Sequence, residues 1–149
     1  MKRVQDVMTK DPACCTPSDS LQQVARMMLD YDCGAIPVVE TASTMRPIGI
    51  ITDRDIACRS VALGKNPLQM TAADCMTPHC ATVSPEDSIE ECEDIMRENQ
   101  VRRVVVVDND GKCCGIVVQA HIARYASEME LAGVLRDISQ PSHTAHAKM

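Results

Sequence analysis

The sequence repeats itself, and this feature constrains the possible folds more than any other. Identical residues recur 68 positions apart, among them Met8 and Met76, Ser20 and Ser88, and Met28 and Met96. The segment AIPVVE (35–40) aligns with RVVVVD (103–108) at the same offset, which falls to 66 at Gly49 and Gly115. A surface loop that is two residues longer in the first copy explains the change, because such loops tolerate insertions. The chain is therefore predicted to contain two copies of one structural unit.

Each copy predicts the order strand, helix, strand, strand, helix, which makes the fold class α+β. Capping-box pairs, Ser20 with Gln23 and Ser88 with Glu91, mark the starts of the two first helices. A short extended piece near 13–16 is the first strand, and apolar runs predict strands at 35–39, 48–52, 103–107 and 115–118. Second helices are expected at about 53–63 and 120–125. We expect repeat 1 with its connector at 1–68, repeat 2 with a closing helix (130–138) at 69–139, and a disordered tail at 140–149.

Composition excludes several classes of function. The chain is 45% hydrophobic but has no Trp or Phe, so aliphatic side chains, Met and Cys must form its core. Its net charge of −6 argues against a nucleic-acid partner, which usually selects a basic surface. No stretch reaches the roughly 20 apolar residues that span a bilayer, and the start MKRVQDVMTK lacks the apolar run of a signal peptide. We expect a cytoplasmic protein without a membrane partner.

The nine cysteines form neither a disulfide framework nor a recognisable zinc motif, since their number is odd and none lies in a C-x-x-C pair. Small buried core residues are the simplest interpretation. Cys80 beside His79 is the best metal candidate, and a cysteine-based metal or redox sensor is kept as the alternative function. The four histidines show no spacing with Cys, Ser or Asp that indicates a catalytic triad, so no enzyme activity is predicted.

One segment combines a buried strand with polar residues at its end. GIITDRD (49–55) follows an apolar strand with a threonine and then two aspartates around Arg54. Thr52 lies where the strand is predicted to become a helix, and the exposed N–H groups of a first helical turn favour anions. Asp55 lies one turn further on roughly the same side. The pattern T-x-x-D is equally a helix capping box that requires no ligand.

These features together resemble the cystathionine beta-synthase (CBS) domain pair over about residues 4–139. The resemblance is carried by VMT and CMT, by TPSDSLQQVARMM against SPEDSIEECEDIM, by GAIPVV against RRVVVV, and by GIITDRD. It implies two β-α-β-β-α repeats packed face to face as one module. It also implies a regulatory sensor without catalysis, which requires no cofactor and binds AMP, ADP or ATP, or in some members NAD or S-adenosylmethionine. The protein that it regulates is left unnamed.

The resemblance assigns roles to particular residues. Thr52 would contact phosphate and Asp55 the ribose hydroxyls, because a carboxylate is a strong acceptor, with Arg54 as a weaker phosphate contact. Arg59 and Lys10 are interpreted as solvated surface charges. An adenine slot is expected at Cys15, Thr16, Ile36 and Pro37, although Cys15 and Ile36 also suit a core. Arg102 or Arg103 could reach the phosphate, or instead pair with an acid such as Asp108.

The two clefts are expected to differ in chemistry. In the second copy GIVVQAH replaces GIITDRD, so Val118 stands for Thr52 and His121 for Asp55. We predict one strong adenosine site per chain, and a second cleft that is empty, weak or used by another ligand.

A homodimer is also predicted, because one chain of this size cannot cover all the apolar helix faces of two repeats. The candidate surfaces are Met27-Met28 and Ile95-Met96, although these residues also suit the internal core.

Overall fold

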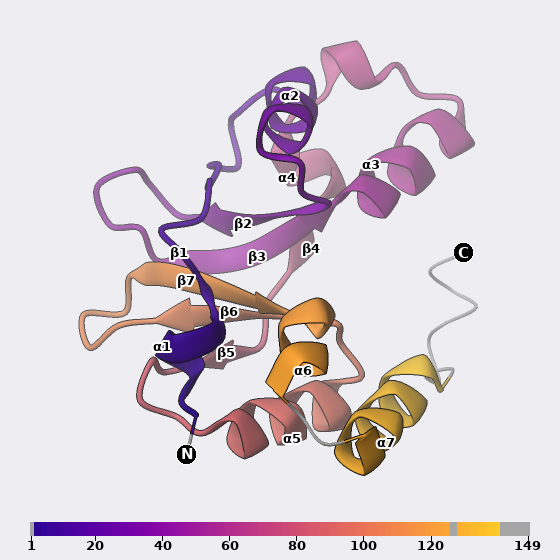
Figure 1. The fold of residues 1–149 in the computed structure, drawn as a ribbon. Helices are drawn as coiled ribbons and strands as arrows, with labels where there is room; N and C mark the ends of the chain where they lie inside the picture. The colour runs from indigo at the N-terminus through magenta and orange to yellow at the C-terminus, as the bar shows by residue number, and fades with distance from the viewer. Residues whose placement is uncertain (1, 126–127, 141–149) are drawn as a thin grey trace. The chain divides into compact units, whose positions relative to one another are not determined.

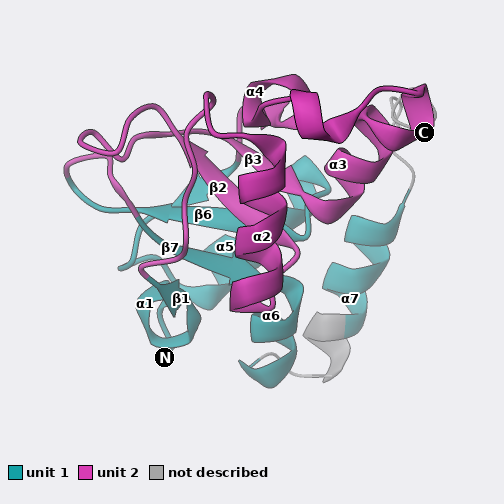
Figure 2. Cartoon of the chain, turned by 90° about the horizontal axis from the view of Figure 1, so that it is seen from above, with its two compact units in different colours: residues 1–10, 81–109, 114–149 teal, residues 11–80, 110–113 magenta. Residues whose placement is uncertain are grey.

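The computed structural model describes residues 2–125 and 128–140 of the chain (Figure 1). The chain forms two compact units, which are coloured separately in Figure 2. Unit 1 contains residues 1–10, 81–109 and 114–149, and unit 2 contains residues 11–80 and 110–113. Packing therefore does not follow the order of the repeats along the chain, because the first ten residues join the unit that contains most of the second repeat.

Unit 2 contains an antiparallel sheet in the order β2-β3-β4. Its strands are β2 (Ala35–Val39), β3 (Pro47–Thr52) and β4 (Thr77–Pro78), and its α-helices are α2 (Leu21–Tyr31), α3 (Asp53–Arg59) and α4 (Ala72–Cys75). Two 3-10 turns, η1 (Val61–Leu63) and η2 (Pro67–Gln69), lie between α3 and α4. Figure 1 shows α2 and α3 on the same side of the sheet, where their apolar residues and the buried face of β2 form one core.

Unit 1 contains a sheet in the order β1-β7-β6-β5. Its strands are β1 (Thr9–Lys10), β5 (Thr82–Val83), β6 (Arg103–Val107) and β7 (Cys113–Val118), the last of which begins at a residue of unit 2. Its helices are α1 (Val4–Val7), α5 (Ile89–Asn99), α6 (Gln119–Tyr125) and α7 (Glu128–Ser139). A second core includes Met96, Val104 and Ile122, all fully buried.

In each sheet, one edge strand comes from the beginning of the repeat that supplies the other sheet. β1 lies near the start of the first repeat but pairs with β7, through Thr9 opposite Ile116. β4 lies near the start of the second repeat but pairs with β3, through Thr77 opposite Ile50. The same exchange places the short helices α1 and α4, and it explains why the units and the repeats have different boundaries.

Most predicted elements are confirmed, and the helix caps explain where the helices start. The predicted strand at 13–16 is wrong, because only Cys15 forms a bridge there. Ser20 and Ser88 each accept a hydrogen bond from the backbone three residues ahead, at 3.1 Å. Of these two helix starts, Ser88 has the full capping box, in which Glu91 accepts from the Ser88 N–H, whereas Ser20 does not. The predicted helix 53–63 is wrong in its second half, because α3 ends at Arg59 and Ser60 leaves helical geometry (φ −127°, ψ −80°) before the turn η1.

The predicted dimer surface is partly wrong. Met28 is 9% exposed and Met96 is fully buried, so both belong to the cores, the alternative that their apolar character allowed. Met27 and Ile95 are partly buried against the same cores. The closing helix is confirmed as α7, while nearly all of the predicted tail, residues 141–149, lies outside the described residues. Among the described helices, none has the length and apolarity needed to cross a membrane.

Candidate nucleotide-binding site

The polar end of GIITDRD lies where β3 passes directly into α3. Thr52 is the last residue of β3 and the N-cap of α3, and it stands opposite Ala35 of β2. Both Thr52 and Asp55 are partly buried. The antiparallel pairing of β2 and β3 therefore holds Thr52 beside the start of β2.

Thr52 and Asp55 form a reciprocal capping box. The Thr52 hydroxyl accepts a hydrogen bond from the Asp55 N–H at 3.0 Å, and Asp55 Oδ2 accepts one from the Thr52 N–H at 3.1 Å. The interpretation of T-x-x-D as a cap is thus correct for this structure. A cap of this kind fixes both side chains at the strand end, and it does not exclude a ligand from the remaining oxygen atoms.

Two further side chains, Thr77 and Arg59, hold Asp55 in place. The Thr77 hydroxyl donates to Asp55 Oδ2 at 3.4 Å, and Arg59 Nη2 lies 3.9 Å from Asp55 Oδ1. Arg59 also donates to the carbonyl oxygens of Cys75 and Met76, at 2.9 and 2.8 Å. The interpretation of Arg59 as a solvated surface charge is therefore wrong. Its position four residues after Asp55 was a usable signal, whereas nothing in the sequence linked Thr77 to Asp55.

The residues predicted for an adenine slot all lie in unit 2. Cys15 forms a parallel bridge to β2, since its N–H donates to Pro37 O at 3.0 Å and its carbonyl accepts from Val39 N at 2.8 Å. Cys15 and Ile36 are each 1% exposed, so both form part of the core. Thr16 is partly buried, and its N–H donates to Asp19 Oδ2 at 2.8 Å.

The predicted arginines lie in different places. Arg54 is exposed on the first turn of α3, close to Thr52 in the chain. Arg102 and Arg103 belong to unit 1. There they line a cleft of about 470 Å³, together with Val118, Gln119, Ala120, Ala123 and Leu135. A contact from either arginine to a ligand at Thr52 stays a prediction.

The second strand-to-helix junction repeats the geometry of the first with different chemistry. Val118 ends β7, and its N–H donates to His121 Nδ1 at 3.0 Å. His121 Nε2 lies 3.4 Å from Thr9 Oγ1. A ring that accepts at Nδ1 carries its proton on Nε2, so Nε2 donates to the threonine. His121 therefore has the capping position of Asp55 without its negative charge.

We expect His121 to remain neutral near pH 7 and to destabilise the fold as it is protonated. Burial, reinforced by nearby Arg124, lowers the pKa of His121 below its ordinary value of 6.5. A group with a lowered basic pKa takes up its proton more readily in the unfolded chain, so stability is highest above pH 6.5 and falls as the pH drops toward the folded pKa. Protonation also removes the acceptor for Val118 N–H.

NMR titration of the His121 ring measures this pKa directly. His121→Asn retains an acceptor that does not titrate, so its melting temperature should fall less than that of the wild type between pH 7.5 and 5.5. A His121 pKa at or above 6.5 would contradict this expectation.

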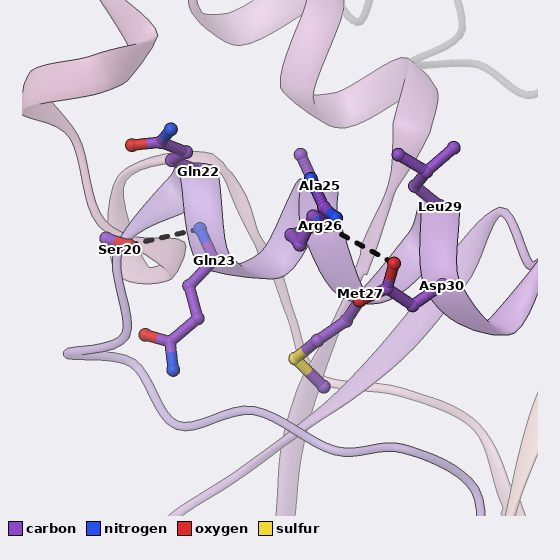
Figure 3. A pocket seen from close by; sticks show the side chains of 8 residues that line it. All are labelled: Ser20, Gln22, Gln23, Ala25, Arg26, Met27, Leu29 and Asp30. Atoms are coloured by element: carbon purple, nitrogen blue, oxygen red, sulfur yellow. Dashed lines mark hydrogen bonds and ion pairs between the residues drawn. The ribbon is translucent and has the colours of Figure 1, made fainter.

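A larger hollow, of about 820 Å³, lies along the outer face of α2 (Figure 3). Its lining residues are Ser20, Gln22, Gln23, Ala25, Arg26, Met27, Leu29 and Asp30. All of them belong to one helix and its N-cap, so the hollow lacks the second wall that a small-molecule site needs. Arg26 pairs with Asp30 at 3.3 Å. We therefore place the candidate site at Thr52 and Asp55 and not at this larger hollow.

The cysteines are the remaining candidates for metal ligands. Within the described residues, no group of three or more His, Cys, Asp or Glu side chains has an arrangement that could hold a metal ion. The suggested pair Cys80 and His79 is thus not completed by further ligands in the described part of the chain, and its donor set does not fit a zinc site, which takes four ligands or three with water.

Comparison with known proteins identifies the family. The family model for the CBS domain matches residues 4–61 and 72–128. The uncharacterized protein YlbB of Bacillus subtilis is 37% identical over 142 residues, which covers 94% of this chain and 93% of YlbB. Hypoxic response protein 1 of Mycobacterium tuberculosis is 31% identical over 141 residues, with 95% and 96% covered.

Two solved structures extend the comparison. Hypoxic Response Protein I, crystallised with two coordinated zinc ions, has a TM-score of 0.73 at 32% identity, covering 85% of this chain and all of that one. The CBS domain pair of protein MJ0100, in complex with 5-methylthioadenosine and S-adenosyl-L-methionine, has a TM-score of 0.74 at 25% identity, with 85% and 100% covered. With both of its repeats matched, this chain belongs to the CBS domain family.

Proposed function

We propose that this chain is a regulatory CBS domain pair that binds an adenosine-containing ligand beside Thr52 and Asp55 and has no catalytic activity of its own. The observation that carries the proposal is that Thr52, which stands opposite the start of β2, is joined to Asp55 by reciprocal hydrogen bonds inside one compact unit. An apolar wall and a polar edge are what a nucleoside with a charged tail requires. The adenosine compounds bound by the MJ0100 domain pair support this ligand class.

The hydrogen bonds around Asp55 favour one of its oxygens for ribose. Oδ2 already accepts from Thr52 N–H and from the Thr77 hydroxyl. Oδ1 faces Arg59 at 3.9 Å, beyond hydrogen-bond distance, and is the better placed of the two to accept from a ribose hydroxyl. The Thr52 hydroxyl accepts from Asp55 N–H and keeps its own proton available for a phosphate or carboxylate oxygen.

A thermal-shift panel tests the ligand class. AMP, ADP, ATP, NAD and S-adenosylmethionine are compared with GMP as a control for the base and with inorganic phosphate as a control for charge. A ligand at a hundredfold excess over Kd adds about 2.7 kcal/mol of stability, which corresponds to about 5–10 °C in melting temperature for a chain of this size. We expect at least one adenosine compound to reach this shift while GMP and phosphate do not.

The outcome separates the proposed functions. If no adenosine compound raises the melting temperature, the nucleotide-sensing proposal fails. Metal analysis of the purified protein, with and without reductant, examines the alternative of a cysteine-based metal sensor, which predicts bound metal in a fixed ratio to the chain.

The homodimer remains part of the proposal. Apolar side chains are exposed in unit 2, including Leu29 (71%) and Tyr31 (67%) at the end of α2 and Val61 (66%) in η1. Such residues suit burial against a second copy of the chain, and light scattering measures the assembly. The regulated protein and a cytoplasmic location are likewise proposals.

A further inference from the structure

Two cysteines that are far apart in the sequence lie side by side in unit 2. Cys14 Sγ is 3.8 Å from Cys113 Sγ, although 99 positions separate them in the chain. Both residues belong to the same compact unit, because the segment 110–113 packs with residues 11–80. Cys14 is partly buried and Cys113 is 6% exposed.

Backbone hydrogen bonds fix the chain at Cys113 and next to Cys14. Cys113 opens β7, and its N–H donates to Met45 O at 2.8 Å. Cys14 directly precedes Cys15, which is bonded to β2 on both sides. The Cys14 thiol also lies 3.3 Å from Pro12 O, to which it donates. The paired backbone segments thus place the two cysteines beside each other.

The pKa of the Cys14 thiol is shifted in the opposite direction from the pKa values of the neighbouring thiols Cys15 and Cys80. A hydrogen bond with Cys113 lowers the pKa of Cys14, outweighing burial and the nearby Cys15, which raise it. Burial raises the pKa of Cys15 to about 12 and, together with the nearby Cys113, that of Cys80 to about 11. Since the thiolate is the reactive form, Cys14 is the favoured nucleophile among these thiols.

We propose that Cys14 and Cys113 form a reversible disulfide when the protein meets a peroxide. The Cys14 thiolate attacks one peroxide oxygen, the O–O bond breaks, and a sulfenic acid forms as hydroxide leaves and is protonated to water. The Cys113 sulfur then attacks the Cys14 sulfur, its proton leaves with the departing hydroxyl as a second water, and the S–S bond closes. Two thiols and one hydrogen peroxide thus give one disulfide and two waters.

The geometry requires only a small movement. The S–S bond length is about 2.05 Å, so the sulfur atoms must approach by a little under 2 Å from their separation of 3.8 Å. The new bond would close a loop that spans the 99 positions between Cys14 and Cys113. Long loops gain the most stability from closure in the chain-entropy model, so the oxidised protein should melt several degrees higher than the reduced one.

Peptide mapping of the full chain tests the proposal. The reduced protein is freed of reductant, treated with one equivalent of hydrogen peroxide, alkylated and digested with trypsin without reduction. We expect residues 11–26 to be linked to residues 113–124, with fragment ions that assign the bond to Cys14 and Cys113. Dithiothreitol should release the link and return the melting temperature to its reduced value.

Matched variants make the result specific. Cys14→Ala and Cys113→Ala should each abolish the linked peptide and the rise in melting temperature, while Cys33→Ala, which removes an exposed thiol, should leave both unchanged. The proposal is overturned if peroxide produces a bond between other cysteines, a bond between two chains, or no bond in the wild-type protein. Because the linked peptide is sought in the wild-type protein, the test does not depend on whether each variant folds.

Discussion

Asp55→Ala is expected to weaken adenosine binding by about 10- to 150-fold. The side chain offers Oδ1 to the ligand in a partly buried setting, with an exposed side-chain fraction of 17%. Loss of a hydrogen bond to a charged group costs about 1.5–3 kcal/mol, and each 1.4 kcal/mol is tenfold in affinity. Isothermal titration calorimetry with the ligand identified by thermal shift measures the change.

The variant also removes one of the two side chains of the capping box on α3, so its controls must separate binding from folding. Asp74→Ala is the matched control, because Asp74 Oδ2 accepts from Thr71 N–H at 2.9 Å in an equivalent capping box on α4. Both variants should lose about 0.5–2 kcal/mol of stability, but only Asp55→Ala should lose affinity. Asp55→Asn retains the acceptor for Thr52 N–H and removes the charge. Its loss of binding free energy should therefore exceed its loss of unfolding free energy.

The same titrations count the sites. His121→Ala should change binding little, and the wild-type stoichiometry should be one strong adenosine site per chain, because a neutral histidine provides a single acceptor, which Val118 N–H already uses. The arginine-lined cleft in unit 1 is then open to a different anionic ligand. Two equal sites per chain, or an Asp55→Ala protein that binds like the wild type, would reduce T-x-x-D to a helix cap.

The secondary structure could be predicted because local rules decide it. Apolar runs and helix caps give β2 and β6 with the predicted limits, and they start α2 and α5 at the predicted residues. Because the sequence is duplicated, each element is indicated twice, once in each repeat. The misplaced end of the second helix has a local cause, since nothing in the sequence marks Ser60 as the residue whose hydroxyl donates to the Ile56 carbonyl and ends α3.

Contacts between segments that are far apart in the chain could not be predicted from the sequence. The exchange of β1 and β4 depends on which sheet edge each of these short strands pairs with. A strand of two residues is too short to show a hydrophobic pattern that would predict its partner. Thr77 reaches Asp55 only through that exchange. The pairing of Cys14 with Cys113 is equally non-local, which explains why cysteine spacing indicated neither a redox pair nor a metal site.

Gly49→Ala is expected to destabilise the protein by about 3 kcal/mol or more, the upper range of what overpacking costs. A Cβ atom at Gly49 would lie 2.5 Å from the backbone oxygen of Thr77. Strand β4 would have to move away from β3, because a carbonyl oxygen in a paired strand cannot rotate aside. The melting temperature should fall by about 6–12 °C, as measured by circular dichroism.

Gly115→Ala is the matched control that the duplication provides. A Cβ atom there would lie 2.5 Å from Met8 Sδ, the flexible end of a side chain, and 3.1 Å from the Thr9 oxygen, so Met8 can turn away and the loss should be smaller. Gly133→Ala meets nothing closer than 3.6 Å inside α7 and should stabilise the helix by about 1 kcal/mol.

The comparison of the two glycines also bears on the site. Displacing β4 moves Thr77 away from Asp55, so Gly49→Ala should weaken adenosine binding even at temperatures where the protein remains folded, whereas Gly115→Ala should not. Equal losses of stability in the two variants would show that β4 moves away from a new Cβ atom as easily as the Met8 side chain does. Strand β4 would then be held too weakly at the edge of its sheet to fix the orientation of Asp55.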